Sequence, residues 1–206
     1  MYNEILIILF AYILGSIPTG AILAKIKGAN IRDLGSGNIG ATNVTRTLGK
    51  KFGAITLLVD VLKGFIPVVL IQKYYLNSRY TGFFSPELFL CATGITVLAG
   101  HIYSVFLKFH GGKGVATSLG IAAGIIPKTA GVAAGLWLVI FLVSRISSLS
   151  ALIAVAGAPV ATYFFYGRST FFYFSILIPI IVVYTHQENI SRLFRGKEKG
   201  FNKTQA

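Results

Sequence analysis

The sequence predicts an all-α integral membrane protein, built as a single domain of residues 1–206 that forms one bundle of about seven transmembrane helices. Two observations support this fold class. Hydrophobic residues make up 54% of the 206 residues and charged residues only 12%, a balance typical of proteins that sit in a bilayer. Apolar runs that approach the roughly 20 residues needed for a spanning helix also follow one another along most of the chain.

The first predicted span begins almost at the N-terminus, in MYNEILIILFAYILGSIPTGAILAK. This segment lacks a basic leading region and an evident small-residue cleavage site, so we expect a retained span and not a signal peptide. The third span contains the single cysteine, Cys91, for which membrane packing is expected. The fourth span is short. The seven predicted spans are residues 4–24, 53–72, 85–107, 114–127, 129–144, 149–166 and 170–186.

Two features inside these spans concern packing. Small residues four apart, Gly120 with Gly124 and Gly131 with Gly135, predict close approach of helices. Asp60 and Lys63 lie three apart and therefore on one helical face. They either neutralise each other within the bundle or belong to a functional site, and the sequence leaves both interpretations open.

The basic residues predict the orientation of the bundle. With 19 Lys and Arg against 6 Asp and Glu, the chain carries a net charge of +13, which favours contact with anionic lipids and anionic substrates. These bases lie between apolar runs, so we expect no nucleic-acid binding. If the N-terminus is outside, only four of them lie in outer segments and Lys63 lies within a span. The outer four are Lys73, Arg79, Lys128 and Arg168, and the inner fourteen are Lys25, Lys27, Arg32, Arg46, Lys50, Lys51, Lys108, Lys113, Arg145, Arg192, Arg195, Lys197, Lys199 and Lys203. The excess predicts an outer N-terminus and a cytoplasmic C-terminus.

Three polar segments interrupt the apolar background, and the predicted topology places all three on the cytoplasmic side. They are residues 35–49, residues 100–118 and residues 186–200. They are rich in glycine, hydroxyl and amide side chains, with Arg46, Lys113 and His186 among few carboxylates. Glycine lets backbone N–H groups approach an anion, while Arg and Lys are the usual partners of phosphate. The glycines suited to this are Gly35, Gly37, Gly111, Gly112 and Gly114. The three segments therefore predict phosphate chemistry beside a membrane.

The named soluble motifs do not fit these segments. Gly35-x-Gly37-x-x-Gly40 follows a membrane span instead of a strand, so it is no dinucleotide fingerprint. FHGGKGVAT fails as a Walker A sequence because Gly114 follows Lys113 where Ser or Thr is needed. None of the three histidines has an aspartate five residues later, so the His-x4-Asp device of many acyltransferases is absent. No metal-ligand set is evident, and we expect no metal and no cofactor.

Each polar feature also has an ordinary interpretation. The glycines from Gly35 to Gly40 form no more than a tight turn in this interpretation, and Lys113 is a simple positive-inside lysine. His186 is then a hydrogen-bonded interfacial histidine, and the roles of His101 and His110 stay open.

The motifs GSGNIGATNVTRTLG, GHIYSVFLKFHGGKGVAT and HQENISRLFRGKE, with DVLKG between the first two, closely resemble the signature motifs of the bacterial acyl-phosphate:glycerol-3-phosphate acyltransferases, the PlsY family. The resemblance covers essentially the whole chain. It implies a seven-helix enzyme of the bacterial cell membrane, with its active site toward the cytoplasm. Such an enzyme transfers an acyl chain from acyl phosphate to glycerol 3-phosphate, giving lysophosphatidic acid and phosphate without coenzyme A.

By resemblance, several motif positions bind substrate or support acyl transfer. The catalytic candidates are Lys113, His186 and Asn189; the substrate-binding candidates are Ser36, Gly37, Asn38, Asn43, Arg46, Gly111, Gly112, Gly114 and Ser148. Ser147 is the alternative to Ser148. Lys113 would stabilise the departing phosphate, and Arg46 with Ser36 would hold glycerol 3-phosphate, although the two phosphate sites could be exchanged.

The physical chemistry of the residues agrees with this reaction. Acyl phosphate is already activated, so no covalent acyl-enzyme is needed. His186 is the candidate base for the glycerol hydroxyl, with an oxygen of the acyl phosphate as the alternative proton acceptor. The expected partners are the two substrates and membrane lipids, and the chain is expected to act as a monomer. A transporter is the rival function, but it would be expected to show internal repeats, and none is detectable here.

Overall fold

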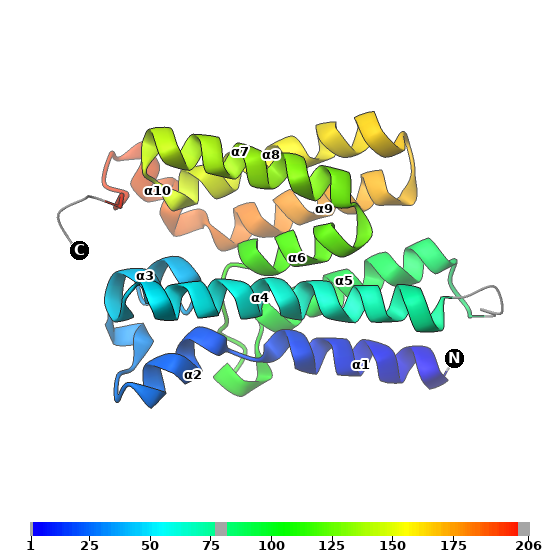
Figure 1. Ribbon diagram of the computed structural model, residues 1–206, viewed down its shortest axis with the longest axis horizontal. Helices are drawn as coiled ribbons and strands as arrows, with labels where there is room; N and C mark the ends of the chain where they lie inside the picture. The colour runs from blue at the N-terminus through cyan, green and yellow to red at the C-terminus, as the bar shows by residue number, and fades with distance from the viewer. Residues whose placement is uncertain (1, 77–81, 202–206) are drawn as a thin grey trace. The chain divides into compact units, whose positions relative to one another are not determined.

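The computed structural model describes residues 2–76 and 82–201, and the regular structure in these ranges is helical (Figure 1). Arg79 and Lys203, which the charge count uses, lie outside these ranges. In chain order the helices are α1 (Tyr2–Ser16), α2 (Thr19–Ile26), η1 (Ile31–Asp33), α3 (Ala41–Leu48), α4 (Lys50–Leu70), η2 (Ile71–Tyr75), α5 (Pro86–Ile102), η3 (Val105–Leu107), α6 (Val115–Ile125), α7 (Pro127–Ser144), α8 (Ser147–Tyr166), α9 (Thr170–Thr185) and α10 (Gln187–Phe194).

The predicted spans correspond to these helices with adjusted boundaries. Four helical stretches of the described chain are long and apolar enough to cross a membrane: Lys50–Tyr75, Pro86–Leu107, Pro127–Ser144 and Ser147–Tyr166. The first predicted span is a bent pair of helices, α1 with α2 at 41°. The last predicted span is α9, which forms a second bent pair with α10 at 68°. Counting each pair as one span gives up to six. The fourth predicted span is α6, whose 11 residues rise about 16 Å, roughly half of a hydrocarbon core. The total of seven spans and their orientation stay predictions.

The break in the first span has a local cause. Pro18 lacks a backbone N–H and disfavours helical geometry in the residue before it, so α1 ends at Ser16 and α2 begins at Thr19. The break leaves the carbonyl groups of Ser16 and Ile17 outside the regular helical pattern. Both carbonyls accept hydrogen bonds from side chains of other elements: Ser104 Oγ donates to Ser16 O and Lys63 Nζ to Ile17 O.

The described chain divides into two compact units, residues 1–125 and residues 126–206. In the first unit, α1 packs against α5, and α4 packs against α3 and α6 (Figure 1). α4 and α6 approach closely because each has a glycine at the contact. A Cβ at Gly64 on α4 would overlap Thr117 O, and one at Gly120 on α6 would overlap Val61 O. The predicted close packing at Gly120 is therefore confirmed.

In the second unit, α7 packs against α8, and α8 packs against α9. The hydroxyls of Thr129 on α7 and Thr162 on α8 are buried and 3.0 Å apart. The prediction of close packing at Gly131 and Gly135 is wrong, because none of the described atoms outside the chain neighbours and the local backbone of α7 lies within 4 Å of a Cβ placed at either glycine. The close approach is instead at Gly157, where a Cβ would meet Leu136 Cδ1 at 2.8 Å.

Candidate active site

The first glycine segment is a loop, residues 34–40, whose shape is set by Asn43 on α3. The buried Asn43 side chain accepts a hydrogen bond from Ser36 N at 2.9 Å and donates to Leu34 O at 3.0 Å and Asn38 O at 2.9 Å. Asn38 in turn accepts from Gly40 N at 2.7 Å. These two amides thus hold the loop backbone in place. Their predicted contact with substrate stays a prediction.

Backbone conformation explains two of the glycines in this loop. Gly35 and Gly37 have φ of 62° and 70°, the left-handed region that favours glycine. A Cβ at Gly35 would also overlap Asn43 Oδ1, so a side chain there would displace the amide that organises the loop. Ser36 between them is exposed. Arg46 lies three residues after Asn43 on the same face of α3 and is therefore beside the loop.

The second glycine segment folds back on the end of α5. Gly111 N donates to Ile102 O at 2.7 Å, and Gly112 N donates to His101 O at 3.0 Å. The terminal carbonyls of a helix have no donor within the helix, and the backbone amides of Gly111 and Gly112 donate to two such carbonyls of α5. The sequence suggested that the N–H groups of Gly111 and Gly112 face an anion. The structure corrects this, since both groups cap α5; a binding role for the two residues stays a prediction.

Lys113 and Gly114 lead directly into α6. Gly114 has φ of 86° and is buried against Leu98 and Ile102, whereas Lys113 is only partly buried. Because α6 begins at Val115, the N–H groups of its first turn have no acceptor within the helix, and the helix dipole favours an anion there. Lys113 therefore brings a positive charge to a helix N-terminus. This arrangement suits a phosphate oxygen.

The two glycine segments are connected. Arg32, which follows the first residue of η1, donates a hydrogen bond from its guanidinium to His110 O, the residue before Gly111. His110 itself is exposed and donates from Nδ1 to Lys108 O at 2.7 Å. From the sequence, Arg32 was expected only to add to the positive charge on the cytoplasmic side. Its contact with His110 holds the two segments together across 78 positions of the chain.

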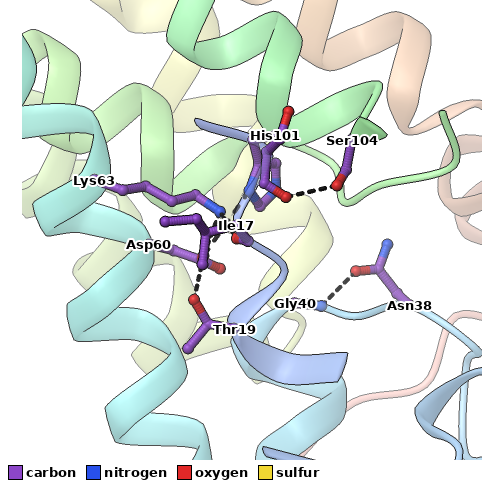
Figure 2. A network of polar contacts seen from close by, with 9 residues as sticks. Ile17, Thr19, Asn38, Gly40, Asp60, Lys63, His101 and Ser104 are labelled. Carbon is purple, nitrogen blue, oxygen red and sulfur yellow. Dashed lines mark hydrogen bonds and ion pairs between the residues drawn. The ribbon is translucent and has the colours of Figure 1, made fainter. Parts of the chain in front are cut away.

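A buried polar cluster lies beneath these segments, where α4, α5 and the break after α1 meet (Figure 2). Lys63 Nζ is 2.8 Å from Asp60 Oδ1 and donates to Ile17 O at 2.8 Å. Thr19 Oγ1 donates to Asp60 Oδ1 at 3.4 Å, and His101 Nδ1 lies 3.9 Å from the same oxygen. Asp60 and Lys63 thus form an ion pair that also contacts other elements, and a role of this pair in a functional site stays open.

In the second unit, His186 occupies the corner between α9 and α10. It is buried, and its Nδ1 lies 2.8 Å from Val182 O. A carbonyl can only accept, so Nδ1 carries the proton and, in the neutral ring, Nε2 carries the lone pair. α9 and α10 meet at a bend of 68°, so His186 lies between two helices and not within one continuous helix.

Ser148 and Asn189 are brought together by Glu198, which was not among the residues predicted to form the site. Glu198 Oε1 accepts hydrogen bonds from Ser148 Oγ at 2.7 Å and from Asn189 Nδ2. Glu198 Oε2 accepts from Arg192 Nε at 2.7 Å. Glu198 lies in the third motif, and a carboxylate in a strongly basic segment is a signal that could have pointed to it.

The surroundings of Glu198 keep it ionised. Burial alone would raise the pKa of this carboxyl, but hydrogen bonds from Arg192, Ser148 and Asn189 outweigh burial and lower the pKa below its usual value. Within residues 2–76 and 82–201, no three His, Cys, Asp or Glu side chains are grouped as they would be to hold a metal ion.

Comparison with known proteins identifies the family. A family model described as glycerol-3-phosphate acyltransferase matches residues 5–196. The chain is 43% identical to the glycerol-3-phosphate acyltransferase of Geotalea daltonii over 203 residues, covering 98% of this chain and 100% of that protein. It is 41% identical to the protein of the same name from Aquifex aeolicus, covering 97% of this chain and 100% of that one.

Two solved structures share the fold. One is the glycerol 3-phosphate form of PlsY, an integral membrane glycerol 3-phosphate acyltransferase; it has a TM-score of 0.87 and 39% identity, and the match covers 97% of this chain and 96% of that chain. The other is the lysphosphatidic acid form of PlsY, with a TM-score of 0.85 and 38% identity, covering 98% and 97% of the two chains. The three motifs, the helical architecture and these similarities agree: the chain belongs to the glycerol-3-phosphate acyltransferase family of all-helical integral membrane proteins, the PlsY family.

Proposed function

We propose that the protein transfers a fatty acyl group from acyl phosphate to the 1-hydroxyl of glycerol 3-phosphate, in phospholipid biosynthesis at the bacterial cell membrane. The products are lysophosphatidic acid and phosphate. Membership of the family supports the acceptor, and so do the forms in which its structural relatives were solved, one with glycerol 3-phosphate and one with lysphosphatidic acid. The donor rests on the motif resemblance and on the chemistry of an activated acyl group.

The observation that carries the proposal is the pair of linked glycine segments in the first unit. One precedes α3 and stands beside Arg46, and the other precedes α6 and contains Lys113. Arg32 joins them through His110 O. A reaction between two phosphorylated substrates needs two anion sites near each other, and this arrangement supplies two cationic side chains on a fixed backbone.

In the proposed reaction, the glycerol hydroxyl oxygen bonds to the acyl carbon and the bond from that carbon to the phosphate oxygen breaks. The departing phosphate takes the electron pair. Lys113 and the first turn of α6 stabilise the charge that develops on it, while Ser36, Gly37 and Arg46 hold the phosphate of glycerol 3-phosphate. The reverse assignment of the two phosphates is the alternative.

The proton of the glycerol hydroxyl needs an acceptor. His186 suits this role because the bond from Nδ1 to Val182 O leaves the lone pair on Nε2. An oxygen of the acyl phosphate is the competing acceptor. Asn189 and Ser148, both bound to Glu198, would support the transfer. No coenzyme A, cofactor or covalent acyl-enzyme takes part, and the active site faces the cytoplasm in this proposal.

The test is turnover by the purified protein with palmitoyl phosphate and labelled glycerol 3-phosphate. Palmitoyl coenzyme A and palmitoyl acyl carrier protein serve as comparison donors at matched concentration. We expect labelled lysophosphatidic acid from palmitoyl phosphate alone. Equal rates from all three donors would contradict the proposed donor, and no product from any of them would contradict the proposed function.

A further inference from the structure

The ring of His101 lies directly against the backbone of Gly112. A Cβ added at Gly112 would come well inside 3.0 Å of His101 Nε2, a separation that real side-chain carbons essentially never show. The ring is 4% exposed, and the Gly112 amide is also bound to the carbonyl of the same histidine. His101 therefore contacts Gly112 through both its backbone and its side chain.

The His101 ring is buried next to an ion pair, beyond hydrogen-bond distance from it. His101 Nδ1 lies 3.9 Å from Asp60 Oδ1, which Lys63 also contacts at 2.8 Å (Figure 2). Charged side chains within a membrane span are costly, and where they occur they are commonly paired and functional. The ion pair, the histidine and the glycine thus form a continuous path of contacts from the interior of α4 to the residue before Lys113.

The same cluster reaches the first glycine segment through α2. Thr19, the first residue of α2, donates to Asp60, and the next residue, Gly20, packs so closely on the first segment that a Cβ there would overlap Ile39 O. Both proposed phosphate-binding segments are therefore supported from one buried cluster.

We propose that His101 is a positioning residue for the proposed acyltransferase site. Its buried ring, which lies next to the Asp60–Lys63 ion pair, is the surface on which Gly112 rests, and it thereby sets the position of Lys113 and Gly114. On this inference, Gly112 is a glycine because the histidine ring occupies the space beside it. The alternative is that position 112 must be bare because a substrate phosphate approaches it. The inference rests on the function proposed above.

A double-mutant cycle separates these two explanations. Gly112→Ala, His101→Ala and the combined variant are compared with the wild type for KM of glycerol 3-phosphate, for kcat and for the melting temperature Tm. Gly112→Ala alone should raise KM about tenfold, because the new methyl group meets the ring and shifts the loop. In the combined variant the ring is gone, so KM should return to within about threefold of that of His101→Ala. Coupling of about tenfold lies within the roughly 2- to 150-fold range found for residues in contact.

Gly135→Ala is the matched control. It adds the same methyl group to a glycine on α7, where the new Cβ would meet no described atom within 4 Å outside its chain neighbours and the local helix backbone, so KM, kcat and Tm should stay at wild-type values. Asp60 and Lys63 are left intact, because removing one partner of a buried ion pair is strongly destabilising by itself. If His101→Ala does not fold, His101→Ser, which also removes the ring, replaces it in the cycle.

A combined variant whose KM defect is at least the product of the two single defects would overturn the inference, because position 112 would then need to be bare for the substrate. Recovery of Tm without recovery of KM would also overturn it, since the ring would support the fold without positioning the site. A wild-type protein without turnover would instead contradict the proposed function. In that case coupling in Tm alone decides whether the contact between ring and glycine exists.

Discussion

Replacing Lys113 by alanine separates stabilisation of a departing phosphate from simple attraction to the membrane. Lys113 is partly buried, stands between the buried Gly112 and Gly114, and precedes the first turn of α6. Two unit charges 4 Å apart interact by about 4 kcal/mol at an effective dielectric of about 20 and by about 1 kcal/mol in bulk water. For a partly buried lysine that contacts the transition state, a loss of about 2 to 4 kcal/mol is therefore expected. This corresponds to a rate reduced about 30- to 1000-fold.

Lys108→Ala is the matched control. Lys108 lies five residues earlier in the same segment and is exposed, so its charge is screened by water and salt. We expect less than a threefold effect on turnover. The backbone at Lys108 has φ of 52°, but alanine keeps the same stereochemistry there, so lysine and alanine carry a similar conformational penalty.

The assay measures the initial rate of lysophosphatidic acid formation from palmitoyl phosphate and glycerol 3-phosphate, after Tm and membrane insertion are shown to match the wild type. A folded Lys113→Ala protein with near wild-type turnover would refute the assignment. So would a defect no larger than that of Lys108→Ala. Either result would mean that the charge at position 113 serves orientation in the membrane and not the reaction.

Three further predictions concern other parts of the chain. Arg46→Lys keeps the charge but removes the two-pronged guanidinium, so KM for glycerol 3-phosphate should rise about tenfold while Tm changes little; an unchanged KM would argue against a bidentate phosphate contact. Glu198→Gln should lower the unfolding free energy at pH 7 by about 1.5 to 3 kcal/mol, because charge-assisted hydrogen bonds are lost. Since the folded pKa of Glu198 lies below its usual value of 4.5, this advantage of the wild type is present above about pH 4.5 and fades as the pH falls through the folded pKa, which chemical denaturation at several pH values can follow. After Cys91→Ala, a single cysteine at Lys108 or Lys197 should be labelled only from the cytoplasmic side, and one at Arg79 only from outside; labelling of the first two from opposite sides would refute the predicted topology.

How well a structural feature could be predicted from the sequence depends on how far apart along the chain its residues lie. Spans were predictable because the apolar run that forms a helix is local, and α4 and α5 lie within a few residues of the predicted limits. The glycines with positive φ, such as Gly37 and Gly114, were predictable as loop positions for the same reason.

Contacts between distant positions were not predictable in this way. Nothing in the spacing of residues shows that His101 lies against Gly112 or that Arg32 reaches His110, since one contact depends on a chain reversal and the other on the packing of separate elements. The use of Gly111 and Gly112 as caps had a local signal, because the end of a helix needs donors and glycine loops often supply them. The prediction instead followed the association of glycine loops with phosphate, and it therefore directed these N–H groups toward an anion.

The break after Ser16 has a consequence for how the protein is made. α1 rises about 22 Å before the break, so the predicted topology places the carbonyls of Ser16 and Ile17 within the roughly 30 Å hydrocarbon layer, where an unmatched carbonyl is costly. Their donors, Ser104 and Lys63, are synthesised 88 and 46 residues later. At roughly 5 to 20 residues per second, the ribosome reaches Ser104 about 4 to 18 s after Ser16. The side-chain hydrogen bonds at the break in the first span thus form only after later segments of the same chain have been made.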